Sequence, residues 1–340
     1  MPDAFIEPTL SPVAPTHLSA GVAMCTYNGG RFLRAQLESI ALQSELPQRM
    51  AIVDDGSVDG SWELLQRWAA TAPFEVQLHR NSENLGVVRN FERAIGLLEQ
   101  DVVFLADQDD IWYPDKLKKF VDCFIADPEL GLLHSDADLI DGDGRLLRRR
   151  LFDTLLVTAQ ERQEVGDGKA YRVYSKRNLV TGAASAFRRT ILLHALPFSG
   201  IWVHDEWLAF IAALTSKVVL MDESLMSYRL HGSNAIGVPI PNLAWRIRTI
   251  VSAFWQPVSH RQCLRAARLR EMESRAVGIG ATPEMQCYLA AAADHADFRS
   301  QLPRNPVTRF LRVLEERRAG NYHAWSNGET SILHDLLLGN

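Results

Sequence analysis

The chain has 340 residues, 47% of them hydrophobic and 23% charged, which is an ordinary globular composition and allows one large domain or two smaller ones. Its formal net charge of -5 argues against a broad nucleic-acid-binding surface. The four cysteines contain no CxxC pair, which favours reduced thiols in the cytoplasm. No apolar stretch reaches the roughly 18 residues that a membrane span requires, so we expect a protein that is soluble or bound to a membrane surface.

The first part of the chain shows strands that alternate with helices. Residues 1–18 come first, a leader with several prolines and without the basic segment of a signal peptide, which we expect to be flexible. Apolar runs predict strands at 20–26, 50–53, 74–80 and 101–107, and helical spacing predicts helices at 31–43, 61–70 and in the second part of 81–99. This alternation within about 110 residues predicts an α/β domain with a mainly parallel sheet flanked by helices.

The pattern changes in the second part. We expect a strand at 131–138, a hairpin turn at DGDG (141–144) and a polar, irregular segment at 153–178. A calcium loop that starts at Asp136 is excluded, because Ile140 would stand where an oxygen ligand is needed. The remaining predictions are an extended segment or strand at 181–187, a helix at 204–214, a last strand at 217–222, and a domain boundary near PIP (239–241), beyond which the composition is helical and rich in arginine.

Polar and acidic residues follow the first four predicted strands. They read TYN (26–28), DDGS (54–57), HRN (79–81) and DQDD (107–110). The carboxyl ends of parallel strands lie on one edge of a sheet, and open α/β sheets bind their ligands there, so these segments should meet. Neither the GxxxxGK[ST] phosphate loop nor the GxGxxG dinucleotide fingerprint occurs, which disfavours a P-loop site and an NAD site.

Three of the four aspartates in the segment ADQDDIWYPD (106–115) lie within positions 107–110. Asp107 and Asp109 are two residues apart in an extended segment, so their side chains point to the same side and can share one cation. Mg²⁺ or Mn²⁺ suits such oxygen ligands and leaves coordination positions for substrate phosphates. The alternative is a solvated acidic loop. In either case we expect Asp110 to cap a helix that begins near Trp112.

Eight motifs in order resemble those of family 2 inverting glycosyltransferases, especially the bacterial rhamnosyltransferases that build O-antigen and other cell-wall polysaccharides. They are TYNGG, VDDGSVDG, NLGVVRNFERA, LADQDDIWYPDKL, HSDADLID, TGAASAF, HDEWLA and YRLHGSN. The resemblance covers residues 19–237. It implies a GT-A fold whose first half binds a nucleotide-diphospho-sugar donor and whose second half binds the acceptor. Residues 238–340 are only loosely similar to helical extensions of that branch.

The resemblance assigns the donor side of the site by position. Asp54 or Asp55 would hydrogen-bond the base or ribose, and the choice between them stays open. A divalent cation, Mg²⁺ or Mn²⁺, would be held by Asp109 and His231, with Asp107 as a further candidate ligand. The other nucleotide-binding positions are Thr26, Asn28, Asn84, Gly86 and Asp107, of which Gly86 could instead be a plain turn into a helix.

On the acceptor side, the resemblance makes Asp205 the catalytic base, which takes the proton of the attacking hydroxyl. A base of this kind contributes about 10²–10⁴ in rate. Asp205 could also be the N-cap of the helix at 204–214, Glu206 is the alternative base, and His204 is expected to be a neighbour. The candidates for sugar or acceptor contacts are Asp136, Asp138, Trp112, Tyr113 and Trp202, and the aromatic residues among them fit core packing equally well.

The combined prediction is a metal-dependent inverting glycosyltransferase of bacterial surface polysaccharide synthesis. The resemblance to rhamnosyltransferases favours dTDP-rhamnose as donor and a saccharide or lipid-linked oligosaccharide as acceptor. UDP- and GDP-sugars remain alternative donors. A nucleotidyltransferase is disfavoured, because the loop CTYNGGRF has too little glycine and lysine to hold a triphosphate. A non-catalytic binding protein would be expected to lack one of Asp107, Asp109 and Asp205, and all three are present.

The segment LAWRIRTIVSAFW (243–255) places apolar residues along one side of a helix. It could lie on the inner face of the cytoplasmic membrane, where lipid-linked acceptors reside. The alternatives are packing on the first domain or on a second copy in a homodimer. We therefore expect a cytoplasmic protein, free or at the inner membrane face, that binds no nucleic acid.

Overall fold

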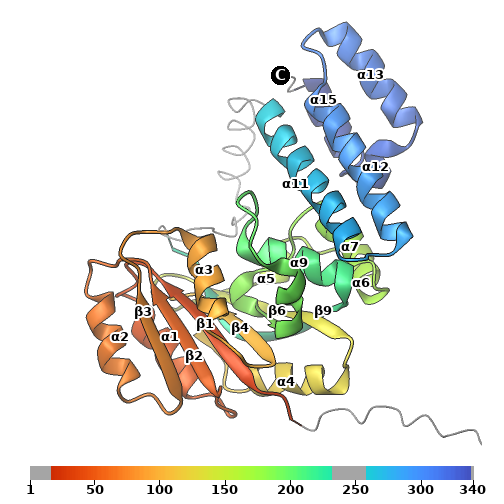
Figure 1. The fold of residues 1–340 in the computed structure, drawn as a ribbon. Helices are drawn as coiled ribbons and strands as arrows, with labels where there is room; N and C mark the ends of the chain where they lie inside the picture. The colour runs from red at the N-terminus through yellow and green to blue at the C-terminus, as the bar shows by residue number, and fades with distance from the viewer. Residues whose placement is uncertain (1–16, 232–257, 338–340) are drawn as a thin grey trace, which may run out of the picture.

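The computed structural model describes residues 17–231 and 258–337 (Figure 1). The predicted leader, the domain boundary at residue 238 and the amphipathic segment 243–255 lie wholly or mostly outside the described residues. The strands are β1 (Ala20–Thr26), β2 (Arg49–Asp54), β3 (Glu75–Arg80), β4 (Val102–Ala106), β5 (Ile111–Trp112), β6 (Leu130–Ile140), β7 (Leu146–Arg150), β8 (Ser185–Arg188) and β9 (Lys217–Arg229).

Helices connect and follow these strands. In the first domain they are α1 (Leu33–Ala41), α2 (Ser61–Ala69), α3 (Val87–Gly96), α4 (Lys116–Ala126), α5 (Leu151–Thr154), α6 (Ala159–Gly166), α7 (Ala170–Tyr174), α8 (Leu192–Ala195) and α9 (His204–Thr215), with 3-10 helices η1 (Gly182–Ala184) and η2 (Arg189–Ile191). The C-terminal region has α11 (Val258–Gly278), α12 (Pro283–Ser300), α13 (Pro306–Arg318), α14 (Asn321–Trp325) and α15 (Glu329–Leu337).

The strands form one mixed sheet in the order β3-β2-β1-β4-β8-β6-β9-β5, with β7 paired to β6. β1 is parallel to β2 and β4, and β2 is parallel to β3, as the alternation of strands and helices predicts. β8 runs antiparallel to both β4 and β6, and β9 runs parallel to β6. The predicted α/β sheet flanked by helices is confirmed; the half built from the first four strands is wholly parallel, and the other half is mixed.

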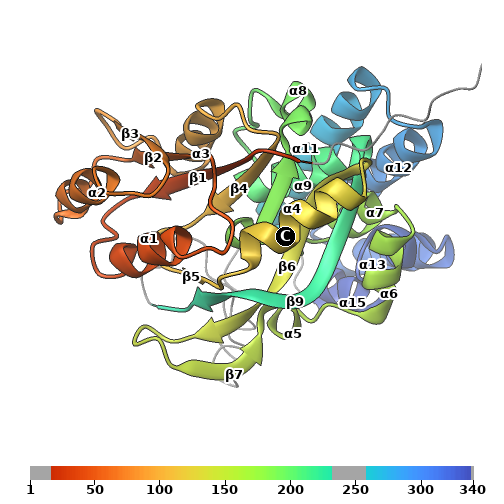
Figure 2. The same ribbon diagram turned by 90° about the horizontal axis from the view of Figure 1, so that it is seen from below.

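Helices cover both faces of this sheet (Figure 2). Apolar residues of α1, α2 and α4 pack on one face, and those of α3 and α9 pack on the other. Because side chains alternate along a strand, Val22 and Met24 of β1 belong to the first core, whereas Ala23 and Cys25 belong to the second. Burial on both faces explains why the first strands read as continuous apolar runs.

Two segments differ from the predictions. Residues 153–178, expected to be irregular, contain α6 and α7. α6 begins with a capping box, in which Thr158 and Glu161 each accept a hydrogen bond from the backbone N–H of the other. The last strand, β9, continues to Arg229 instead of ending at 222, because it pairs with β6 and then with β5. The predicted hairpin turn at 141–144 is confirmed between β6 and β7.

The described C-terminal residues are helical, as predicted. α11 and α12 lie side by side above the first domain in Figure 1, and Leu269 and Met272 of α11 join the core that contains α9. Farther on, Arg299 and Asp335 form a buried ion pair at 2.7 Å next to a small core of α13 to α15. Within the two described ranges, none of the helices combines the length and the apolar character needed to cross a bilayer.

Candidate functional site

The carboxyl ends of the first four strands form one edge of the sheet. Thr26 of β1 lies in register beside Asp54 of β2, and Asp54 lies beside Arg80 of β3. Asp107 directly follows β4, which pairs with the other side of β1. The structure therefore brings the four polar segments together at the edge where ligands bind in open α/β sheets.

Asp54 is fully buried and holds the DDGS turn. Its carboxylate accepts hydrogen bonds from the Thr26 hydroxyl at 3.0 Å and from the backbone N–H and hydroxyl of Ser57 at 2.9 and 2.5 Å. The Arg80 guanidinium lies 3.5 Å away. A carboxylate can be buried when donors surround it in this way. The oxygens of Asp54 are thus directed to the protein, and they fix both Thr26 and the turn.

Asp55 likewise accepts hydrogen bonds from protein groups, and these hold the loop Asn84-Leu85-Gly86, called the NLG loop below. It accepts hydrogen bonds from the Asn81 side-chain amide at 2.6 Å and from the backbone N–H groups of Leu85 and Gly86 at 2.8 and 2.9 Å. Gly86 has φ 79°, which side-chain-bearing residues rarely adopt, and α3 begins directly after it. Gly86 therefore forms the turn into α3. Gly86 and Asn84 lie in the loop between β3 and α3, at the carboxyl edge of the sheet. A contact of either aspartate with base or ribose stays a prediction.

Gln108, for which the sequence predicted no role, ties the DQDD segment to the loop after β1. Its side-chain amide donates to the Tyr27 carbonyl at 3.1 Å, and its oxygen accepts from the Tyr27 N–H at 2.9 Å. A Cβ at Gly29 would lie 2.2 Å from this oxygen and displace the side chain. Asn28 is in the left-handed region with φ 51° and accepts from the Val58 N–H at 2.9 Å. The loop after β1 is thus held on one side by Gln108 of the DQDD segment and on the other by Val58, which follows the DDGS turn.

Asp107 and Asp109 meet side chains from two distant parts of the chain. His231, just after β9, places its Nε2 2.7 Å from Asp109 Oδ2. Burial, followed by the charges of Asp109 and of Asp205 from α9, raises the pKa of Asp107 to about 7. Residues of the motifs DQDD, HDEWLA and YRLHGSN therefore act on one another at this edge, and their roles as metal ligands and base stay predictions.

Asp110 has a different role from the predicted helix cap. It is fully buried, and its Oδ1 accepts the backbone N–H of Arg229 at 2.9 Å. Arg229 Nε also donates to the Asp109 carbonyl at 2.6 Å. α4 begins only at Lys116, with Asp115 as its N-cap residue. The prediction that Asp110 caps the helix is wrong, because the short strand β5 intervenes and pairs with β9.

Lys116 is a buried cation near these carboxylates. Its Nζ donates to the Ala183 carbonyl at 2.6 Å and lies 4.0 Å from the centre of the Trp112 ring. Burial lowers the pKa of Lys116 to about 7, against the opposing charges of Asp110 and Asp107. Burial likewise raises the pKa of Asp110 well above its usual range. Burial and like charge therefore oppose the ionisation of Asp107 and Asp110, and Lys116 acts in the opposite direction on both.

Asp205 lies in the first turn of α9, opposite η1. Its Oδ2 accepts the backbone N–H of Gly182 at 2.9 Å, and its Oδ1 accepts that of Glu206 at 2.7 Å. α9 begins at His204 with Val203 as the N-cap residue, so Asp205 is not the cap itself. Burial raises the pKa of Asp205 to about 6. The group is therefore ionised at neutral pH and is more basic than an exposed carboxylate.

The residues beside Asp205 in the sequence make other contacts. His204 is buried and stacks on Phe91 with ring centroids 3.9 Å apart, and burial lowers its pKa to about 3, so it stays neutral. This agrees with its expected role as a neighbour. Glu206 forms an ion pair with Arg268 of α11 at 3.1 Å. Asp205 has no such cation within hydrogen-bonding distance in the described part of the chain.

Two predicted sugar contacts lie in the core instead. Trp112 is 2% exposed and packs near Phe104, with ring centroids 6.0 Å apart. Of the two alternatives for Trp112, a sugar contact or core packing, the structure shows core packing. Asp136 is 4% exposed, and its Oδ1 accepts from the backbone N–H groups of Ala137 and Phe152 at 2.9 Å each. A direct acceptor contact of Asp136 does not fit this burial.

The other predicted acceptor residues are also engaged within the protein. The Tyr113 hydroxyl donates to Asp138 at 2.8 Å. Trp202 is mostly buried, and its indole N–H donates to Glu271 at 3.1 Å. The Arg268 guanidinium lies 5.0 Å from the centre of the Trp202 ring. Trp202 thus belongs to the boundary between the first domain and α11.

The donor set at the edge fits a divalent cation with few protein ligands. Asp109 and His231 are in contact, and Asp107 lies in the same cluster. Among residues 17–231 and 258–337, no three His, Cys, Asp or Glu side chains are grouped so as to hold a metal ion alone. Mg²⁺ usually takes one or two protein carboxylates and completes its shell with water and substrate phosphates. Asp109 and His231, with Asp107 nearby, have the donor atoms that such an ion needs, and the binding of a metal here stays a prediction.

The architecture is that of solved glycosyltransferases. A mannosyltransferase from Pyrobaculum calidifontis, in complex with GDP-Man and Mn²⁺, matches with a TM-score of 0.54 at 19% identity over 96% of this chain and 88% of that one. TarS 1-349 from S. aureus, in complex with UDP, matches with a TM-score of 0.51 at 15% identity over 91% and 89%. The fold, with its carboxylate-bearing sheet edge, is therefore of the GT-A type.

The sequence comparison gives the family. Residues 21–192, about half of the chain, match the model of Glycosyl transferase family 2, so the chain belongs to this family and is a glycosyltransferase. It is 28% identical over 225 residues to the dTDP-rhamnosyl transferase RfbG of Shigella flexneri (64% of this chain, 74% of that one). It is 25% identical over 224 residues to the uncharacterized glycosyltransferase alr2836 of Nostoc sp. (64% and 66%). The predicted family is confirmed.

Proposed function

We propose that the chain is an inverting glycosyltransferase, which moves a sugar from a nucleotide diphosphate to an acceptor hydroxyl with Asp205 as general base. The observation that carries the proposal is the cluster at the sheet edge. Asp109 contacts His231 at 2.7 Å, and the charge of Asp205 acts on Asp107. Residues for the leaving group and a base for the attacking group thus lie in one site. Such an arrangement suits a displacement that forms one bond as another breaks.

In this mechanism Asp205 takes the proton of the acceptor hydroxyl while the oxygen bonds to the anomeric carbon and the bond to the diphosphate breaks. The attack comes from the face opposite the diphosphate, which inverts the configuration. The backbone N–H groups of Gly182 and Glu206 fix the carboxylate, and the N-terminus of α9 favours its negative charge. A pKa of about 6 suits a base that works near pH 7.

The donor nucleotide is assigned to the loops at the same edge. These are the loop after β1 with Asn28, the DDGS turn, and the NLG loop with Asn84 and Gly86. Asp54 and Asp55 support the nucleotide indirectly in this proposal, because their oxygens already bind the protein groups that shape these loops.

Asp109 and His231 are the residues that would hold Mg²⁺ or Mn²⁺, with Asp107 beside them. When bound, the cation supplies positive charge to the departing diphosphate. Arg229 supports these residues, because it fixes the DQDD backbone and directly precedes the loop that carries His231. Lys116, whose pKa burial lowers to about 7, adds part of a positive charge near Asp107 and Asp110.

The choice of substrate rests on similarity. The relative RfbG is named a dTDP-rhamnosyl transferase, and the chain is 28% identical to it. We extend this to dTDP-rhamnose as donor and to a saccharide or lipid-linked oligosaccharide of bacterial surface polysaccharide synthesis as acceptor. The reaction would then take place in the cytoplasm or at the inner membrane face. Segment 243–255 stays the proposed contact to that membrane or to a second copy.

A donor screen tests this function. The purified full-length chain is incubated with dTDP-, UDP- and GDP-sugars and Mg²⁺ or Mn²⁺, and release of the nucleoside diphosphate is measured, with water as a slow acceptor. We expect dTDP-rhamnose to be turned over fastest. Faster turnover of a UDP- or GDP-sugar would reject rhamnose as the transferred sugar. No turnover, combined with no metal-dependent thermal stabilisation by any nucleotide, would reject the proposed function as a whole.

Turnover should also fall on the acid side of a pKa near 6. Asp205 has its pKa raised to about 6 by burial, so it loses the base form as the pH drops below that value. With saturating donor and metal, the rate should then fall about tenfold per pH unit. Nucleotide binding measured at each pH is the control, because Asp107 titrates nearby with a pKa of about 7. A rate that stays constant from pH 7 to pH 5 would contradict the role of Asp205.

A further inference from the structure

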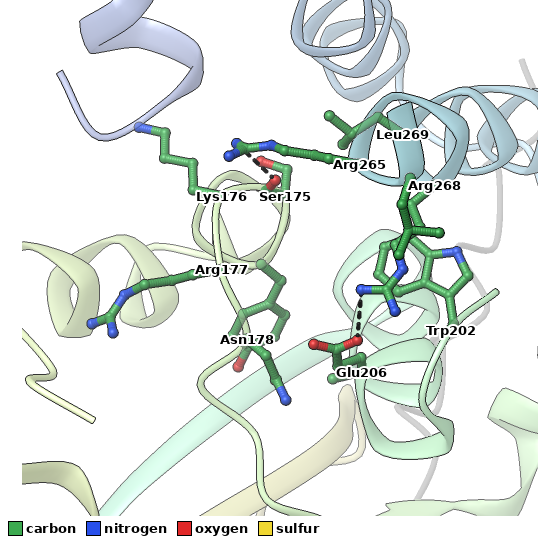
Figure 3. A pocket seen from close by; sticks show the side chains of 12 residues that line it. Ser175, Lys176, Arg177, Asn178, Trp202, Glu206, Arg265, Arg268 and Leu269 are labelled. Atoms are coloured by element: carbon green, nitrogen blue, oxygen red, sulfur yellow. Dashed lines mark hydrogen bonds and ion pairs between the residues drawn. The ribbon is translucent and has the colours of Figure 1, made fainter. Parts of the chain in front are cut away.

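A cavity of about 220 Å³ adjoins the residues that hold Asp205 (Figure 3). One wall is the segment that runs from Tyr174 to Asn178, shortly before Gly182. The second wall is formed by Trp202 and the start of α9, including Glu206, and the third is one side of α11. The first wall leads along the chain to Gly182, and the second wall contains Glu206. The backbone N–H groups of these two residues bind the Asp205 carboxylate. The cavity therefore borders the start of α9, the helix that carries the proposed base.

Four cations line this cavity, and two of them are neutralised by carboxylates. Arg268 is 3.1 Å from Glu206, as the dashed line in Figure 3 marks. Arg177 is 2.7 Å from Glu161, and in Figure 3 it points away from the other labelled side chains. These two pairs leave no net charge between them.

Among the described residues, no carboxylate lies within ion-pair distance of the other two cations, Arg265 and Lys176, although the charges of Glu164 and Glu161 act on Lys176 from farther away. Arg265 extends from α11 toward the turn at Ser175, and within the described residues it donates to the carbonyls of Ser175 at 3.4 Å and Trp325 at 3.0 Å. Burial lowers the pKa of Arg265 to about 10, so the guanidinium stays charged at neutral pH. Lys176 Nζ makes no hydrogen bond with the described part of the chain. The cavity therefore carries two cations that form no ion pair with the described part of the chain.

Lys176 also borders a second cavity of about 380 Å³ between α6, α7 and the turn before α15. That cavity is lined by three carboxylates, Glu161, Glu164 and Glu329. Their charge disfavours an anion there. An anion that contacts Lys176 is therefore favoured in the first cavity, where Arg265 is the second cation.

We propose that the first cavity is a phosphate-binding subsite for the acceptor, with Arg265 and Lys176 as the recognising groups. A phosphate monoester or a diphosphate diester carries close to two negative charges and can contact both cations, whereas a carboxylate carries one. Trp202, Leu264 and Leu269 supply an apolar side next to the charged groups. The proposal rests on the proposed function, because Asp205 as base defines which side is the acceptor side.

Binding of inorganic pyrophosphate in the presence of EDTA tests the subsite without donor, metal or turnover. Titration calorimetry on the full-length chain should give one site per molecule. Arg265→Gln and Lys176→Met should each weaken it by about tenfold or more, because each removes a charged donor. Arg270→Gln is the matched control, since Arg270 lies on the same helix but pairs with Asp294 and Asp297. It should bind as the unmodified chain does.

Two further arms separate the possible explanations. Asp109→Asn, which changes the donor side, should leave pyrophosphate binding intact, and a loss there would place the ion in the donor site and overturn the proposal. Vesicles with and without phosphatidic acid show whether a lipid-borne phosphate is also taken, which an Arg265-dependent difference in flotation would establish. Absence of pyrophosphate binding, or equal binding by Arg265→Gln, Lys176→Met and Arg270→Gln, would reject the subsite. Metal-dependent nucleotide binding, measured in parallel, reports separately on the proposed function.

Discussion

Asp205→Asn is expected to lower donor turnover by about 10²–10⁴ while nucleotide binding persists. The amide has the size of the carboxylate and can still accept the Gly182 N–H, so the start of α9 should keep its position. It cannot take a proton from the attacking hydroxyl. The nucleotide loops are held by Asp54 and Asp55, which the substitution does not touch. Release of nucleoside diphosphate measures the rate, and thermal shift with nucleotide and Mn²⁺ measures binding.

Glu206→Gln is the companion variant, because Glu206 is the alternative base. Burial raises the pKa of Glu206 as well, but its carboxylate is already paired with Arg268 at 3.1 Å. A carboxylate that shares its charge with a guanidinium is a weaker base than one held only by backbone N–H groups. Near-normal turnover by Asp205→Asn, together with a large loss in Glu206→Gln, would transfer the role of base to Glu206.

The parts of the site that follow strands could be predicted from the sequence, because strand ends are marked by local composition. Asp107 and Asp109 follow the apolar run of β4, and parallel pairing alone brings them to the edge that Thr26 shares. His231 and Asp205 required the resemblance, since nothing local places them near β4. Their observed proximity arises from the pairing of β9 with β5 and from the packing of α9 on the sheet.

The roles that could not be predicted depend on contacts between distant segments. Lys116 stands in the sequence KLKKF, which is typical of a solvated helix start, yet it is fully buried against the Ala183 carbonyl from η1. Asp110 looks like a helix cap until β5 is known to pair with β9. By contrast, the capping box of Thr158 and Glu161 is a local signal, and it could have predicted α6 within the segment expected to be irregular.

Asp109→Asn is expected to abolish most of the metal-dependent part of nucleotide binding. A neutral amide replaces an anionic ligand, so the affinity for a divalent cation falls, while the side chain can still hydrogen-bond to His231. In the unmodified chain, nucleotide with Mn²⁺ at 100 times Kd should stabilise the folded state by about 2.7 kcal/mol, and thermal shift should show this increment largely lost in the variant. Asp122→Asn, at an exposed ion pair of α4, removes the same charge and should keep the full shift.

The melting temperature without ligand separates a metal ligand from a structural residue. Asp109 crowds Asp107 and Asp110, and its charge raises the pKa of both. Removing that charge should therefore leave the ligand-free protein as stable as before or more stable, even as nucleotide binding loses its dependence on Mn²⁺. Electron paramagnetic resonance of free Mn²⁺ counts the bound ion directly. A variant that melts lower without ligand, yet keeps its Mn²⁺-dependent shift, would make Asp109 a structural partner of His231 and would reject it as the metal ligand.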